Sequence, residues 1–195
     1  FPNTEIAVFS SNYELYGEIT GRVMSIIRKM SPQSFRYSID EAFAILDGFS
    51  LDQLTSWGQE LHDRVLQSVG MPLSIGIAPT KTLAKMASHF AKKYPGYNHC
   101  CIIDNDQRRT KAETLYPIDE VWGIGRRYAS RMTAMGIKTA YDFASHSDSW
   151  VRSTCKNIVS ERTWQELNGT DCIPDDVPTK KQSICTSRSF DGMIN

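Results

Sequence analysis

The chain has 195 residues, enough for one large domain or two small ones, and 41% of them are hydrophobic, which is ample for a core. Lysine plus arginine equal aspartate plus glutamate at 22 each, so the net charge is zero and gives no indication of a nucleic-acid partner. Five cysteines, two of them adjacent and none in a CxxC pair, argue against a disulfide framework or a zinc site and favour a reducing compartment. Without a membrane-spanning apolar run or a signal peptide, the sequence predicts a cytoplasmic protein with no membrane partner.

Alternating strands and helices are predicted for the first hundred residues. The apolar spacing predicts strands at 5–10, on both sides of Asp40-Glu41, at 73–77 and at 100–103. It predicts helices from Ser10 or Ser11 to just before Pro32, from about 51 to 68, and from Pro79 or Thr80 to about 93. The order β-α-β-β-α-β-α-β predicts helices packed on one sheet, an α+β arrangement.

The pattern changes near Asn105, after which almost everything to Asn168 is predicted to be helical, in short pieces. We therefore predict a domain boundary between Asn105 and Tyr116. Residues 169–182, with two prolines among five charged side chains, are predicted to form a linker, and residues 183–190 to begin a further element. Because the chain starts at Phe1 and stops just after that element, we expect it to be a fragment of a longer protein.

Two adjacent carboxylates, Asp40 and Glu41, interrupt an apolar, strand-like run. Burying an unpaired charge is costly, so a carboxylate pair at the edge of a strand indicates a positive partner, and a divalent metal is the strongest candidate. The alternative is an acidic hairpin turn without a metal, and the pair considered alone favours this alternative.

The predicted third helix carries a row of lysines. At about 100° per residue, Lys81, Lys85 and Lys92 fall within roughly 40° of one another, opposite Leu83 and Phe90. Such a row is typical of a solvated helix face, and it is also typical of a surface that contacts phosphates.

The segment Val121-Trp122-Gly123-Ile124-Gly125-Arg126-Arg127 has the pattern of a helix-hairpin-helix motif. Glycines let the backbone approach a phosphate closely, and the amides that begin the next helix can donate to it. A tight connection between two packed helices is the alternative, and the arginines after the hairpin favour DNA backbone binding.

In this order the motifs resemble those of the Y-family, or translesion, DNA polymerases, and most closely those of the UmuC branch. The matching segments are Ser11–Tyr16, Tyr37–Phe43, Ile75–Lys85, Val121–Arg127, Gln182 and Ser187–Phe190. The resemblance implies an α+β fold, with a partial polymerase palm (a mixed sheet with packed helices) followed by a small all-α helix-hairpin-helix thumb. The implied domains are a palm at 1–104, a thumb at 105–168, a linker at 169–182 and the start of a little finger at 183–195.

The resemblance also implies roles for individual residues. Asp40 and Glu41 are the expected catalytic and metal-binding carboxylates, serving two Mg²⁺ ions, and Lys92 is the expected contact to the incoming nucleotide. The expected DNA-contacting residues are Lys81, Lys85, Gly123, Gly125 and Arg126. The first metal-binding aspartate of the family has no counterpart in this chain, so we expect the chain alone to be inactive.

For the intact protein, the resemblance implies error-prone, template-directed DNA synthesis in the SOS damage response of a bacterium, in the cytoplasm near the nucleoid. The implied partners are primer-template DNA, dNTP, a UmuD′-like subunit, RecA and a sliding clamp. Three alternatives stay open: a non-catalytic helix-hairpin-helix DNA-binding module, a polymerase IV-type enzyme of the same family, and an α+β protein with no nucleic-acid role.

Overall fold

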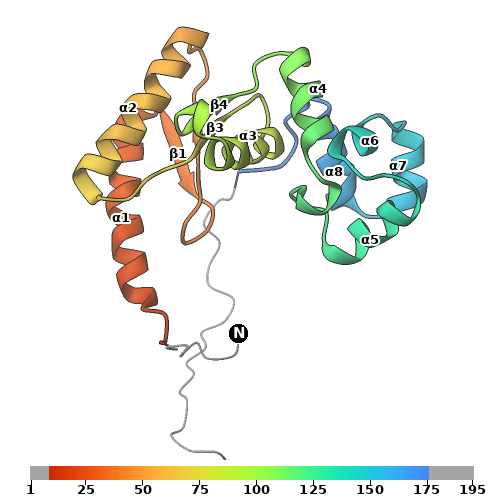
Figure 1. Cartoon of the computed structure of the whole chain (residues 1–195), viewed down its shortest axis with the longest axis horizontal. Helices are drawn as coiled ribbons and strands as arrows, with labels where there is room; N and C mark the ends of the chain where they lie inside the picture. The colour runs from red at the N-terminus through yellow and green to blue at the C-terminus, as the bar shows by residue number, and fades with distance from the viewer. Residues whose placement is uncertain (1–8, 176–195) are drawn as a thin grey trace, which may run out of the picture.

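The computed structural model describes residues 9–175 and consists of a small α/β part joined through one helix to a cluster of short helices (Figure 1). The α-helices are α1 (Tyr13–Met30), α2 (Leu51–Val69), α3 (Lys81–Lys93), α4 (Asp106–Leu115), α5 (Arg126–Ala134), α6 (Ala140–Ala144), α7 (Asp148–Cys155) and α8 (Ile158–Leu167). The strands are β1 (Gln33–Arg36), β2 (Ala42–Ile45), β3 (Ile75–Ile77) and β4 (Cys100–Ile102), and the 3-10 helices are η1 (Pro95–Tyr97) and η2 (Ile118–Glu120). No helix in the described part is both long and apolar enough to cross a membrane.

The strands pair as two separate two-stranded sheets within the described residues. Strands β1 and β2 form an antiparallel hairpin in which Phe35 lies opposite Phe43, whereas β3 and β4 are parallel, with Ile75 opposite Cys100. Parallel strands need a crossover, and α3 supplies it. The α+β class is confirmed, but the prediction of one mixed sheet was wrong for the described residues, because the antiparallel pair and the parallel pair do not hydrogen-bond to each other. The predicted strand at 5–10 lies largely outside the described residues, as do Gln182 and the predicted element at 183–190.

Helices α1 and α2 lie side by side and form a small core with β3 (Figure 1). Helix α1 is capped by Asn12, whose side chain accepts a bond from the Leu15 amide, so the predicted cap at Ser10 or Ser11 was wrong by one or two residues. Helix α2 begins with a capping box between Ser50 and Gln53. Trp57 joins the two helices by donating its indole N–H to the carbonyl of Met30.

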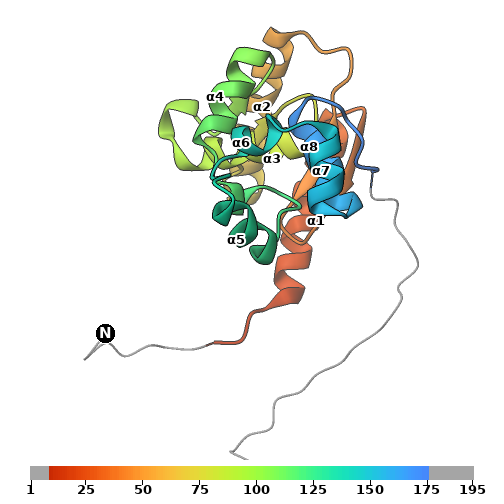
Figure 2. The ribbon, with the colours of Figure 1, turned by 90° about the vertical axis from the view of Figure 1, so that its right-hand side faces the viewer.

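Helix α3 is shared by the two halves of the molecule. It packs on β3 so closely that a Cβ added to Gly76 would lie 2.0 Å from the carbonyl oxygen of Ala84, which explains the glycine in this strand. Its buried residues Leu83, Met86 and Phe90 belong to the large core that also contains the buried apolar residues of α4–α8. The helical cluster therefore lies on the side of α3 away from α1 and α2, as Figure 1 shows, and it faces the viewer in the turned view of Figure 2.

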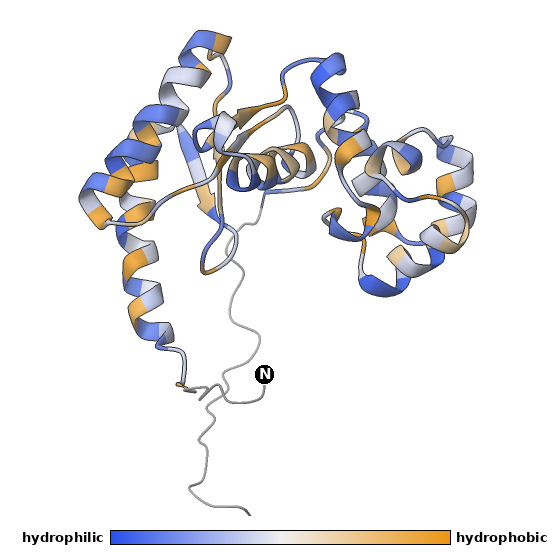
Figure 3. Ribbon diagram, viewed as in Figure 1, coloured by the Kyte–Doolittle hydropathy of each residue, from blue (hydrophilic) through white to orange (hydrophobic). Residues whose placement is uncertain are grey.

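Helix α4 is the first of the helical cluster, and its cap Asn105 lies at the start of the predicted boundary region. Figure 3 shows α4 as mostly hydrophilic, in keeping with a helix that buries only Ala112 and Glu113. The core beneath it is formed by residues such as Phe143 and Leu167, both fully buried.

Candidate functional site

The two carboxylates of the acidic pair lie in the turn that connects β1 to β2, and both are exposed. The amides of Tyr37 and Ser38 both donate to the carbonyl of Glu41, at 2.9 and 3.1 Å, and so close the turn. The hydroxyl of Ser38 donates to Asp40 Oδ1 at 2.7 Å. From α1, the hydroxyl of Thr20 donates to the carbonyl of Ile39. The turn is thus fixed by its own backbone and by α1, while the carboxylates face outward.

Glu41 has a cationic partner on α3. Lys85 Nζ lies 2.5 Å from Glu41 Oε1, and the side chain of Lys85 is 23% exposed. The same ammonium lies 5.0 Å from the ring centroid of Tyr37 and 5.3 Å from that of Trp122. Partial burial strengthens both kinds of contact relative to open solvent. Lys85 therefore joins the acidic hairpin to α3 by charge and by cation–π contacts.

An aromatic cluster connects this hairpin to the helical region. The rings of Tyr37 and Trp122 meet edge to face at 5.4 Å, and the Trp122 indole N–H donates to the Tyr37 hydroxyl at 3.2 Å. Phe43 of β2 lies 5.7 Å from Tyr37 and 6.0 Å from Trp122, between ring centroids. The acidic pair, the α3 lysine and the predicted helix-hairpin-helix segment thus meet at one place, although they lie far apart in the sequence.

The three lysines of the predicted row have different surroundings. Lys92 is exposed and Lys85 is bound to Glu41, but Lys81 is buried and lies 3.1 Å from both Asp171 and Asp175. Burial alone lowers the pKa of the Lys81 ammonium, but hydrogen bonds and ion pairs with the two aspartates outweigh it, so the pKa is raised. The three lysines therefore do not form one continuous solvated face. Of the three, only Lys92 is exposed to solvent.

The glycine hairpin between η2 and α5 contains two glycines with different constraints. Gly123 has φ +91°, and a Cβ there would lie 2.2 Å from Thr163 Oγ1, whose hydroxyl donates to the carbonyl of Trp122. Gly125 has φ −74°, and an added Cβ would meet open space. Internal packing thus requires glycine at position 123 and leaves the surface at position 125 open to an external group.

The N-terminus of α5 begins at Gly125 without a side-chain cap, whereas the seven other α-helices in the described part each have one. Amides in the first turn of a helix are donors with no intrahelical partner and favour anions. Arg126 is exposed at this end and, with Lys138, lines an adjoining groove of about 920 Å³. This arrangement is chemically suited to a phosphate group.

The different constraints on the two glycines lead to a testable difference in stability. We expect Gly123→Ala to lower the free energy of unfolding by about 1–3 kcal/mol, because alanine is strained at this positive φ and its methyl group displaces Thr163. Urea denaturation of the chain measures this loss. Gly125→Ala is the matched control and should cost less, about 0.5–1 kcal/mol, because its methyl group meets open space and alanine is only a poorer N-cap than glycine. Equal losses in the two variants would contradict the assignment.

Comparison with known proteins identifies the class of this fold. A Y-family DNA polymerase chimera containing Dbh segments superposes with a TM-score of 0.68 at 21% identity, covering 86% of this chain and 48% of the other. The fold is therefore that of the corresponding part of a Y-family polymerase. Residues 2–89 match the impB/mucB/samB family.

Sequence identity shows which of these polymerases the chain resembles more. The chain is 40% identical over 193 residues to protein UmuC of Salmonella typhimurium, which covers 97% of this chain and 46% of UmuC. It is 27% identical over 169 residues to DNA polymerase IV of Corynebacterium diphtheriae, covering 84% of this chain and 36% of that protein. The chain thus has the fold of Y-family polymerases and, as predicted, a sequence related to UmuC, of which it spans just under half the length.

Sequence reasoning found the acidic pair, Lys85 and the glycine hairpin, but it did not predict the aromatic contacts that join them. Tyr37 and Phe43 were present as alternating aromatic positions on either side of the acidic pair, and Trp122 preceded the hairpin. In the sequence, the only sign of this contact was therefore that large aromatic residues stand next to both motifs, Tyr37 and Phe43 beside the acidic pair and Trp122 before the glycine hairpin.

Proposed function

We propose that the chain is part of an error-prone translesion DNA polymerase that carries out template-directed nucleotidyl transfer in the SOS damage response. One observation carries this proposal: the exposed Asp40 and Glu41, Lys85 and the Trp122 hairpin meet at one place in a chain related to UmuC. Since the chain spans just under half of UmuC, the activity proposed is that of a longer protein containing it.

We assign residues 1–104 to the palm, 105–168 to the thumb with its helix-hairpin-helix, 169–182 to a linker and 183–195 to the start of the little finger. The boundary between the first two is supported by the position of Asn105, which follows β4 and caps α4. In this assignment the thumb would pack on the palm through α3, whose buried residues share one core with those of α4–α8.

Asp40 and Glu41 suit a magnesium site in part. Both present exposed carboxylate oxygens, the ligand type that Mg²⁺ prefers, and an exposed turn leaves room for the metal's waters. Within residues 9–175, however, no cluster of three or more metal-ligating side chains occurs, so these two need a further ligand from outside that set. When bound, two Mg²⁺ ions would supply charge neutralisation at the triphosphate and activation of the primer 3′-hydroxyl.

The protein's own groups would position the substrates. Asp40 would hold metal, and Glu41 would do so after exchanging its contact with Lys85. Lys92, exposed near the end of α3, would contact the triphosphate as a point charge. Because Lys85 already lies beside Glu41, metal binding would release its ammonium for a DNA phosphate.

The proposed contacts to the DNA backbone are Gly123, Gly125, Arg126, Lys85 and Lys81. The uncapped first turn of α5 and the open surface at Gly125 support the hairpin's part in binding. Lys81 has the weakest support, since its charge is already balanced by Asp171 and Asp175. Further proposed partners of the intact protein, from its relation to UmuC, are dNTP, a UmuD′-like subunit, RecA and a sliding clamp, and the proposed location is the bacterial cytoplasm.

A primer-extension assay tests this function. We expect the longer protein to extend a primer with Mg²⁺, including past an abasic site, and the isolated 195-residue chain to bind the same primer-template without extending it. The reason is that the site needs more carboxylates than Asp40 and Glu41 provide. Mg²⁺-dependent synthesis by the isolated chain would contradict the incomplete site.

The same preparations separate the polymerase from a non-catalytic DNA-binding module. Titration with Mn²⁺ should detect weaker metal binding to the Asp40→Asn variant of the longer protein than to the unchanged protein. If that variant and the unchanged protein bind Mn²⁺ equally and neither preparation extends a primer, the chain is better described as a helix-hairpin-helix binding module.

A further inference from the structure

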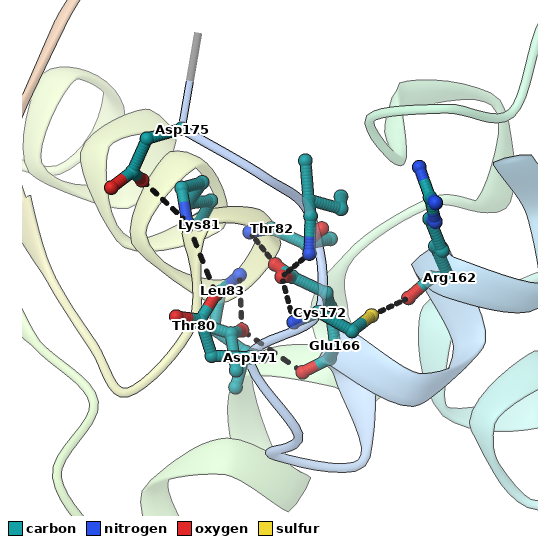
Figure 4. A network of polar contacts seen from close by, with 10 residues as sticks. Thr80, Lys81, Thr82, Leu83, Arg162, Glu166, Asp171, Cys172 and Asp175 are labelled. Carbon is teal, nitrogen blue, oxygen red and sulfur yellow. Dashed lines mark hydrogen bonds and ion pairs between the residues drawn. The ribbon is translucent and has the colours of Figure 1, made fainter. Parts of the chain in front are cut away.

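The buried carboxylate of Glu166, near the end of α8, makes an unusually complete set of backbone contacts (Figure 4). Its Oε2 accepts the Thr82 amide at 2.8 Å, and its Oε1 accepts the amides of Cys172 and Ile173, both at 3.1 Å. The carbonyl of the same residue accepts the Thr80 hydroxyl at 2.9 Å. Glu166 is fully buried, so all of these contacts are shielded from water.

Two of the contacted segments are far apart in sequence. Thr80 is the N-cap of α3 and Thr82 lies in its first turn, where amides lack intrahelical partners and a negative charge is favourable. Cys172 and Ile173 belong to the segment predicted as a linker. One carboxylate thus satisfies the start of a palm helix and two amides of the segment that leaves the helical region.

Lys81 binds the same segment through two ion pairs. Its ammonium, on a side chain 9% exposed, lies 3.1 Å from Asp171 and from Asp175, which flank the two amides bound by Glu166. Charge-assisted hydrogen bonds of this kind are stronger than neutral ones, although the exposed side chains of Asp171 and Asp175 leave the two pairs open to partial screening by solvent. The side chains of Glu166 and Lys81 therefore bind the segment 171–175 at four of its five residues.

We infer that Glu166 and Lys81 act together as a latch that fixes residues 171–175 to the N-terminus of α3. The part of the chain after residue 175 then starts from a fixed point beside α3 and not from the end of a freely moving linker. In this arrangement Lys81 is a positioning residue whose charge is used within the protein. The inference does not depend on the proposed polymerase activity, because it concerns contacts inside the described chain.

Cys172 supplies a native probe of the latch. Its thiol is partly buried and donates to the carbonyl of Arg162, whereas the thiol of Cys155 is buried in the core. Alkylation of the 195-residue chain by iodoacetamide under native conditions, followed by peptide mass spectrometry, reports each cysteine separately. Opening of the latch should expose Cys172 and leave Cys155 protected.

We expect Glu166→Gln to speed the alkylation of Cys172 by about ten- to a hundredfold, because a charged acceptor of three amides is lost. Lys81→Met should speed it by about tenfold. Glu161→Gln on α8 and Lys93→Met on α3 are matched controls and should leave the rate unchanged. A double-mutant cycle with Asp171→Asn should be non-additive for Lys81→Met, as is typical of residues acting through one contact.

An unchanged Cys172 rate in both Glu166→Gln and Lys81→Met would overturn the latch. If Cys155 becomes reactive in parallel, the variant has unfolded and its Cys172 rate no longer reports on the latch. Hydrogen exchange in the unchanged chain then tests whether the latch exists. A latch requires the amides of Cys172 and Ile173 to be protected in that chain, and exchange at the rate of a free peptide would overturn it. Protected amides, with faster exchange at Cys172 and Ile173 in the Asp171→Asn, Asp175→Asn double variant, would support it.

Discussion

Replacing Asp40 by alanine in a longer protein that contains this chain is expected to reduce primer extension by about 10²- to 10³-fold, the usual range for removing one preorganised electrostatic group at a reacting centre. The structure explains why the loss should be confined to chemistry. Asp40 is exposed, and the only side chain that hydrogen-bonds its carboxylate within the described residues is Ser38. The turn itself is closed by backbone bonds to Glu41 and by Thr20, none of which involves the Asp40 side chain.

Two measurements accompany that result. Primer-template affinity, measured by fluorescence anisotropy, should stay within about twofold, and the free energy of unfolding should change by less than about 0.5 kcal/mol, as is usual for a surface substitution. Asp47→Ala is the matched control, since Asp47 is an exposed acid at the other end of the same hairpin and should be dispensable for extension. Near-normal extension by Asp40→Ala would remove Asp40 from the proposed metal site.

The features predicted well from sequence are those fixed by near neighbours. The α+β class followed from the order of strands and helices, and Thr80 was correctly identified as one of two possible starts of α3. The acidic pair was predicted between two strands because the apolar residues alternate on both sides of it. None of these inferences required knowledge of which distant segments meet.

The features that were missed depend on tertiary contacts. A helical wheel gives the direction of a side chain from its own axis but says nothing about what covers it. Lys81 points in nearly the same direction as Lys92, yet the segment 90 residues later carries Asp171 to it. Likewise, Trp122 meets Tyr37 across 85 residues, a contact that local periodicity cannot encode.

The two glycines of the hairpin illustrate the same limit. The pattern treats Gly123 and Gly125 alike, because both fit a motif that needs close backbone approach. The structure separates them, since Thr163 of α8 lies against position 123 while position 125 faces open space. The first glycine is explained by packing inside the chain, and only the second is left for an external ligand to explain.

Glu113 on α4 is a buried carboxylate that the proposed function does not use. It is 3% exposed, and its Oε1 has no hydrogen-bond partner among the described residues. Burial raises the pKa of this carboxyl from 4.5 to about 7, and the nearby positive charge of Arg109 only partly opposes the rise. The folded chain therefore keeps a proton at pH values where the unfolded chain has already released it.

The sign of the effect on stability follows from this difference. Between 4.5 and about 7 the folded state binds more protons at Glu113 than the unfolded state does, so the free energy of unfolding falls as the pH rises through this interval. Above this interval the loss of unfolding free energy is complete, and it amounts to about 3 kcal/mol. We expect Glu113→Gln, which keeps the shape and removes the ionisation, to be more stable than the unchanged chain by a similar amount, about 3 kcal/mol, on the alkaline side of this interval.

Urea denaturation of both chains across that pH range measures the effect, and the difference between them isolates Glu113 from the other titrating groups. Glu60→Gln is the matched control, because Glu60 is exposed on α2 and paired with Arg64, so its removal should leave the pH dependence unchanged. Parallel pH curves for the unchanged chain and Glu113→Gln would show that Glu113 ionises normally in the fold. A convergence of the two curves at acid pH, with a widening gap as pH rises, is the expected pattern, because only the ionised carboxylate is costly to bury.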